Sequence, residues 1–222
     1  MKKKFVFVIA LCILCFAFSG CGKIDKDTVE FSLVQKEVVS ASDDNFFVSI
    51  VSGARENPFV IDGETKNNEN FTTLTALPLH FDLFDKTYTF TVQGDKGSYE
   101  GKLEAQKTGS GYSADIKTTS IIGNILSVEI KDADNVYTFA PTSKMGEFTY
   151  MDAYEKAKET FASTLEKEKA SGTKREIVVK YISDGKNDDS SFYWYVAFMK
   201  SDADFLSVLL DGKTGKIIAQ RG

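Results

Sequence analysis

The six residues TYTFTV (Thr87–Val92) alternate strictly between threonine and a large apolar side chain. Successive side chains of a β-strand point to opposite faces of the sheet, so Tyr88, Phe90 and Val92 share one face and the threonines share the other. This pattern is typical of an antiparallel sheet with one buried and one solvated face. We therefore expect the surrounding region to be built from β-strands.

Similar apolar runs lie on both sides of this stretch, and turn residues such as Asp62-Gly63 separate them. The candidate strands are residues 29–35, 45–51, 98–106, 112–118, 125–131 and 135–139. Short strands at a spacing of roughly ten residues are typical of sandwiches and barrels. The sequence therefore predicts an all-β N-terminal domain over residues 28–146, an antiparallel sandwich or barrel.

The apolar period changes after Pro141. A stripe of apolar residues at steps of three and four predicts one amphipathic helix of about twenty residues, with Tyr150, Tyr154, Ala157, Phe161 and Leu165 on its buried side. Thr149 followed by Asp152 predicts a capped start, and Ser171-Gly172 predicts the end. The charged residues of this segment are expected to form its solvated face.

Four candidate strands follow the helix, at residues 176–183, 192–199, 205–211 and 216–219. The sequence therefore predicts an α+β C-terminal domain over residues 147–222, in which one helix packs on a small antiparallel sheet. The domain boundary is expected near residues 141–148.

This C-terminal arrangement resembles a PepSY-type domain. The resemblance depends on one helix followed by antiparallel strands, on Trp194 and Val196 within one strand, and on the closing hairpin Asp211–Ile218. Domains of this family are associated with propeptides of secreted metallopeptidases and with membrane-attached proteins, and are thought to restrain peptidases. The resemblance implies a binding module rather than a catalyst, and it does not extend to residues 21–146.

The N-terminus has the pattern of a bacterial secretory signal. Lys2, Lys3 and Lys4 precede an uncharged run from Phe5 to Phe18 that is shorter than the ~20 residues a membrane-spanning helix needs. Residues 18–21 (FSGC) resemble a lipobox, in which the cysteine thiol receives diacylglycerol and the cysteine becomes the new N-terminus. The alternatives are an ordinary cleaved signal that leaves a free cysteine, and an uncleaved signal anchor.

We therefore expect a signal peptide at residues 1–20, a lipid-anchored tether at residues 21–27 with lipidation at Cys21, and a location on the extracytoplasmic face of a bacterial cell membrane. The chain has a net charge of −5, and loss of the signal lysines makes the mature chain more acidic. This charge argues against nucleic acid as a partner and against electrostatic adhesion to anionic lipid.

The chemistry of the remaining residues disfavours catalysis. His80 is the only histidine, and we expect it to be a half-buried structural residue. Acylation of Cys21 would leave no cysteine nucleophile, because Cys12 and Cys15 lie in the signal. The acidic segments 132–135 and 202–204 lack the glycine and glutamate of a calcium loop. We expect no catalytic activity, no metal and no cofactor.

Three residues are candidates for contact with a partner. Alternation places Trp194 toward the helix and Tyr193 and Tyr195 on the opposite face. Arg55 lies beside Glu56 and suits recognition of a carboxylate, although a surface ion pair is the simpler interpretation. The sequence thus predicts a protein- or peptide-binding regulatory module whose partner is an extracytoplasmic protein or peptidase. The alternative is a lipoprotein that binds a small ligand or envelope glycan through the β domain.

Overall fold

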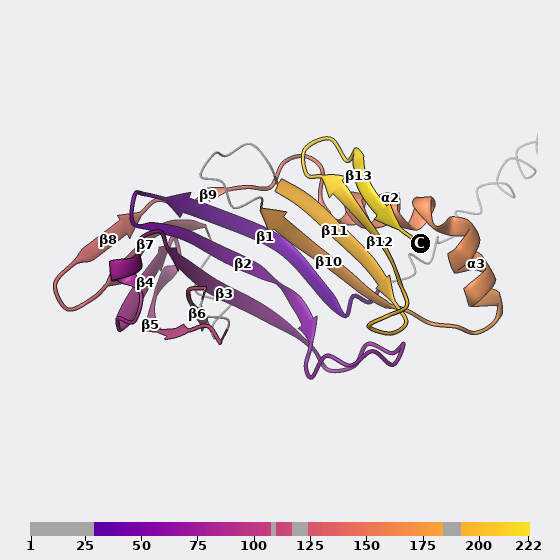
Figure 1. Ribbon diagram of the computed structural model, residues 1–222, viewed down its shortest axis with the longest axis horizontal. Helices are drawn as coiled ribbons and strands as arrows, with labels where there is room; N and C mark the ends of the chain where they lie inside the picture. Colours follow the sequence, from indigo (N-terminus) through magenta and orange to yellow (C-terminus); the bar gives the residue numbers. More distant parts are fainter. Residues whose placement is uncertain (1–28, 108–109, 117–123, 184–191) are drawn as a thin grey trace, which may run out of the picture. The chain divides into compact units, whose positions relative to one another are not determined.

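The computed structural model describes residues 29–107, 110–116, 124–183 and 192–222. The described residues from Phe31 to Gly222 form one compact unit. Their strands make a single mixed sheet in the order β13-β12-β11-β10-β1-β2-β3-β6-β5-β4-β7-β8, with β9 beside β1 (Figure 1). The expected sandwich or barrel followed by a separate α+β domain is therefore wrong, because one large open sheet of 13 strands carries two packed helices.

The strands are β1 (Leu33–Ser42), β2 (Phe46–Glu56), β3 (Asn68–Pro78), β4 (Tyr88–Gly94), β5 (Gly97–Ala105), β6 (Tyr112–Asp115), β7 (Ile125–Lys131), β8 (Val136–Phe139), β9 (Thr142–Ser143), β10 (Glu176–Ser183), β11 (Phe192–Met199), β12 (Phe205–Asp211) and β13 (Ile217–Arg221). The helices are the 3₁₀ turn η1 (Phe81–Leu83) and the α-helices α2 (Tyr150–Thr160) and α3 (Ala162–Ala170).

Strand β1 joins the two regions that the sequence pattern separates. One edge of β1 pairs antiparallel with β2, and the other edge pairs in parallel with β10, where Leu33 faces Val178 and Val34 faces Val179. Every other pair in the sheet is between antiparallel strands. A parallel pair between segments so far apart in the chain leaves no local sequence signal. The change of period near Pro141 marks the start of the helical segment and not the end of a domain.

The larger hydrophobic core lies between β1–β3 and the strands β4–β8. Tyr88, Phe90 and Val92 of β4 are all buried in it, which confirms the face predicted from alternation. The Tyr88 ring meets Phe46 of β2 edge-on at 5.4 Å and Tyr112 of β6 at 4.9 Å. Burial of this many aromatic and branched side chains holds the N-terminal strands together.

A second group of buried residues lies between α2 and the strands around β11. Figure 1 shows α2 lying along one side of these strands. Trp194 is fully buried and its indole N–H donates to the backbone oxygen of Phe148 at 3.2 Å. Phe31, just before β1, meets Tyr154 of α2 edge-on at 5.4 Å. The helix therefore packs on β1 as well as on β10–β12.

The single helix expected from the apolar stripe is two helices. The predicted cap is confirmed, because Thr149 and Asp152 form a reciprocal capping box at the start of α2. At Phe161 the backbone leaves helical geometry (φ −108°, ψ 15°), and α3 begins at the next residue. The Thr160 hydroxyl donates to the Lys156 oxygen at 2.8 Å, a contact that bends helices.

Most predicted strands are present, and those at residues 125–131, 176–183, 192–199 and 205–211 match their predicted bounds. None of the predicted strands corresponds to β3, whose eleven residues (NENFTTLTALP) begin with three polar side chains. Thr73 and Thr75 lie on its more exposed face, while Thr72 is buried on the same face as Leu74 and Ala76.

Candidate functional site

The face of β10–β12 opposite α2 is exposed or half-buried around Tyr193 and Tyr195 and is buried around Ala197 and Ser207. The pairing register aligns Ile182 of β10 with Tyr193 of β11, and Lys180 with Tyr195. Tyr195 in turn faces Leu209 of β12. Ile182 and Lys180 are exposed, whereas the two tyrosines are half-buried. We name these five residues the tyrosine face.

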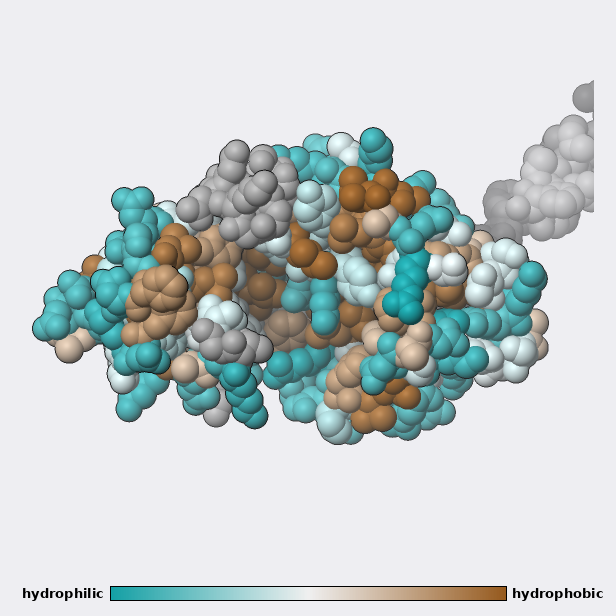
Figure 2. All heavy atoms as spheres, viewed as in Figure 1, coloured by the Kyte–Doolittle hydropathy of each residue, from teal (hydrophilic) through white to brown (hydrophobic). Residues whose placement is uncertain are grey.

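Alternation along β11 is confirmed. Trp194, Val196 and Phe198 are buried on the helix side, while Tyr193 and Tyr195 lie on the other side. None of the described residues hydrogen-bonds to either tyrosine hydroxyl. The tyrosine face therefore offers apolar rings and two hydroxyl groups to a partner. Figure 2 shows that hydrophobic and hydrophilic patches are interspersed over the surface in this view.

Arg55 on β2 takes part in an ion-pair cluster. Its guanidinium donates to Glu69 at 3.1 Å and to Asp115 at 3.4 Å, and it lies over the Phe71 ring at 5.3 Å. Partial burial lowers the pKa of Arg55, but these two carboxylates outweigh it and raise the pKa. Because its charge is already paired within the chain, the arrangement fits the simpler interpretation as a surface ion pair.

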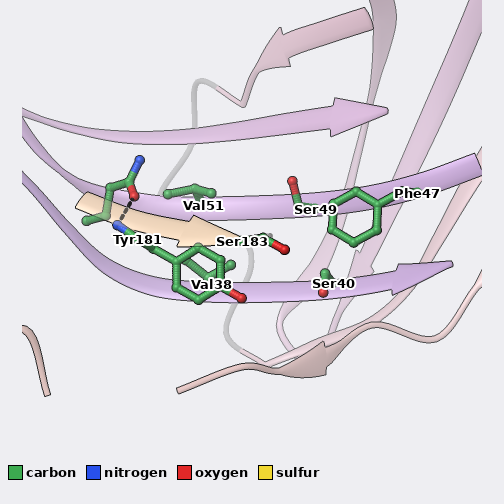
Figure 3. Close-up of a pocket in the computed structure, with 8 residues that line it drawn as sticks. Val38, Ser40, Phe47, Ser49, Val51, Tyr181 and Ser183 are labelled. Atoms are coloured by element: carbon green, nitrogen blue, oxygen red, sulfur yellow. Dashed lines mark hydrogen bonds between the residues drawn. The ribbon is translucent and has the colours of Figure 1, made fainter. Parts of the chain in front are cut away.

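A small hollow opens where β10 separates from β1. The two strands pair only at Leu33 and Val34, and beyond a bulge after Gln35 the same edge of β1 pairs with β9 instead. The carboxamide oxygen of Gln35 accepts a hydrogen bond from the Tyr181 backbone N–H at 2.6 Å, which spans the point of separation (Figure 3). We name the resulting space, of about 180 Å³, the fork hollow.

The fork hollow has a mixed lining from three strands. Figure 3 shows Val51, Ser49 and Phe47 along β2, Val38 and Ser40 along β1, and Tyr181 and Ser183 on β10. Hydroxyl groups, a carboxamide, aliphatic groups and two aromatic rings all border the space. No lining residue carries a formal charge.

Two buried carboxylates hold the loop of residues 57–67 against the sheet. Glu176, at the start of β10, accepts hydrogen bonds from the Ser32 hydroxyl and from the backbone N–H groups of Asp62 (3.3 Å) and Gly63 (2.6 Å). Glu56, at the end of β2, accepts from the Lys66 N–H at 2.8 Å, and its second carboxylate oxygen is buried without a described partner. Neither role was predicted.

Among the described residues, the remaining sequence-predicted features form no site. His80 is exposed, so the expectation of a half-buried histidine is wrong. Within the described ranges there is no group of three or more His, Cys, Asp or Glu residues that could hold a metal ion. Over the same ranges, no helix is long and apolar enough to cross a membrane. Cys21 and the predicted signal peptide lie outside the described residues.

The three predicted partner-contact residues, Tyr193, Tyr195 and Arg55, do not line the fork hollow. The hollow escaped the sequence analysis because its walls are distant segments. Glu176 had a detectable signal, since a glutamate opens the apolar strand EIVVKYIS. Searches against protein-family models, curated proteins and solved structures return no match.

Proposed function

We propose that this chain is a non-catalytic, extracytoplasmic binding protein that is held at the membrane by lipid on Cys21 and engages a protein or peptide through the tyrosine face. The observation that carries the proposal is the position of Tyr193 and Tyr195, which alternate with buried Trp194 yet remain accessible on the side away from α2. Tyrosine is enriched among residues that dominate binding energies.

The composition of the tyrosine face supports a protein partner over a nucleic acid. Tyr193, Tyr195, Leu209 and Ile182 supply apolar contact area, and Lys180 is the single charged member. A nucleic-acid surface would instead present several cations to neutralise phosphates. The resemblance of residues 147–222 to a PepSY-type domain makes an extracytoplasmic peptidase the first partner to test.

Site-specific photo-crosslinking tests the proposal in the producing cell. A photoreactive residue at position 195 should form a crosslink to one defined envelope protein, whereas the same residue at the exposed position 158 of α2 should not. With the purified partner, Tyr193→Ala combined with Tyr195→Ala should weaken binding by about 30-fold or more. Crosslinks that are the same from both positions, or unchanged affinity in the folded double variant, would overturn it.

The anchor is tested separately. Because acylation needs a thiol, Cys21→Ser should abolish incorporation of a fatty-acid probe and change the processing of the precursor. The measurement is metabolic labelling of both forms in the producing cell. Equal labelling of the variant and the wild type would contradict lipidation at Cys21.

A further inference from the structure

We propose that the fork hollow is a binding site for a small neutral ring compound that carries hydroxyl groups, of the size of a monosaccharide. The hollow lies between the diverging ends of β10 and the β1–β2 pair, and its lining shares no residue with the tyrosine face. The inference therefore does not rest on the proposed protein-binding function.

The volume of the hollow sets the size of the ligand. About 180 Å³ is somewhat more than the ~150 Å³ of a cavity that accepts benzene. A single six-membered ring with a few substituents matches this space, while an oligomeric ligand would have to extend beyond it. Purely apolar cavities of this size stay dry, but this one has polar groups on its walls.

The polar groups of the lining are placed to exchange hydrogen bonds with hydroxyl groups. Ser40 and Ser49 are direct cross-strand neighbours, so their hydroxyls lie side by side on β1 and β2. The Gln35 side-chain oxygen accepts a hydrogen bond from the Tyr181 backbone N–H. Among the described residues, none accepts a hydrogen bond from the Gln35 amide nitrogen, and none hydrogen-bonds to the Ser40 or Ser49 hydroxyl. Paired hydroxyls and an amide donor suit a ligand that is both donor and acceptor.

The rest of the lining selects for a neutral ligand with an apolar ring face. Phe47 and Tyr181 offer aromatic surface, and Val38 and Val51 offer aliphatic surface. A charged ligand would lose its hydration without gaining an ion pair, because the lining contains no charged side chain. A pyranose ring, with C–H groups on its face and hydroxyls on its rim, fits this combination.

Tyr181 lines the hollow and lies close to Trp194, whose fluorescence can report on ligand binding. Its ring centroid lies 6.4 Å from that of Trp194, which is the only tryptophan in the chain. The full mature chain in detergent is titrated with D-glucose and with N-acetyl-D-glucosamine, and with glucose 6-phosphate as the charged counterpart. Tryptophan fluorescence follows binding, and saturation-transfer NMR detects the sugar protons whether or not the fluorescence changes.

We expect saturable binding of at least one neutral sugar and binding of glucose 6-phosphate that is at least about ten-fold weaker. Ser49→Leu fills the hollow and should weaken binding at least about ten-fold. Ser127→Leu, the same change at a half-buried position of β7 outside the hollow, should leave affinity within about two-fold. If Ser49→Leu fails to fold, Ser40→Ala, which removes one hydroxyl without adding volume, should still weaken binding.

Three results would overturn the assignment. They are the absence of saturable binding by both neutral sugars, equal affinity for glucose 6-phosphate, and unchanged affinity in folded Ser49→Leu or Ser40→Ala. The Tyr193→Ala and Tyr195→Ala double variant should bind sugar as the wild type does. That control separates failure of this site from failure of the tyrosine face.

Discussion

At the scale of single residues, Asp132 shows how a turn carboxylate stabilises the fold. Burial opposes its ionisation, but hydrogen bonds from the backbone N–H groups of Asp134 and Asn135, and from Lys86, outweigh this and lower the pKa of Asp132 to about 2. The Lys86 nitrogen lies 3.1 Å from the carboxylate. The turn between β7 and β8 is therefore held through an ionised carboxylate.

The sign of the pH dependence follows from this lowered pKa. Because the folded-state pKa lies below the unfolded value of 3.8, the stabilisation is complete above about pH 4 and is lost as the pH falls toward 2. Asp132→Asn should cost about 1–2 kcal/mol of unfolding free energy at pH 7, and the difference from wild type should shrink steadily between pH 4 and pH 3. Denaturant titrations across this range measure it.

Asp134→Asn is the matched control for this prediction. Asp134 is exposed, and among the described residues its carboxylate accepts none of these hydrogen bonds. Its replacement should leave stability nearly unchanged at every pH in the range. A difference between Asp132→Asn and wild type that stays constant down to pH 3 would show that the carboxylate does not act through its ionisation.

Glu176 provides a second prediction at this scale. Glu176→Ala would leave the Ser32 hydroxyl and the N–H groups of Asp62 and Gly63 without their acceptor, and should cost about 2–4 kcal/mol of unfolding free energy. The loop of residues 57–67 should also become a preferred site for chymotrypsin, because Phe59 is already exposed.

The control for Glu176→Ala is Glu69→Ala, which removes the half-exposed partner of Arg55 and should cost less than about 1 kcal/mol. Thermal melts and limited proteolysis of both variants decide the matter. Equal melting temperatures for Glu176→Ala and Glu69→Ala would mean that the buried carboxylate does not hold the loop.

At the scale of secondary-structure elements, β11 gives the sharpest contrast between its two faces. Trp194→Ala should cost about 3–5 kcal/mol, because it empties a fully buried position under α2. Tyr195→Ala, one residue away on the tyrosine face, should cost clearly less. Chemical denaturation followed by far-UV circular dichroism measures both, and a larger loss for Tyr195→Ala would mean that the partner-binding face is misassigned.

How far the elements could be predicted from sequence depended on whether their signals are local. Alternation correctly placed Trp194 and Tyr195 on opposite faces, and the capping pair at Thr149 correctly marked the start of α2. The break at Phe161 was missed, since neither proline nor glycine marks it. The fork hollow could not be predicted, because Gln35 and Tyr181 meet only after distant strands have paired.

At the scale of the whole molecule, the architecture depends on β1. This strand contacts β2, β9 and β10 along its edges, and α2 packs against it. The short parallel contact at Leu33 and Val34 thus joins the predicted N-terminal and C-terminal regions. Local periodicity predicts most of the strands, but the predicted division into two domains is wrong, because long-range pairing is not encoded in local periodicity.

A sheet that is continuous through β1 should unfold as one cooperative unit. Trp194 fluorescence reports on the β11 region, and hydrogen exchange of the β4 and β7 amides reports on the other end of the strand order. Val34→Ala, which truncates a buried side chain at the junction, should lower the stability seen by both probes equally.

The most direct test of the single-sheet architecture is therefore equilibrium unfolding in denaturant, followed on the same samples by Trp194 fluorescence and by the exchange of the β4 and β7 amides. The continuous sheet predicts coincident transitions in the wild type, and an equal shift of both transitions in Val34→Ala. Two separate transitions, of which Val34→Ala moves only one, would contradict it and would show two independently folding domains.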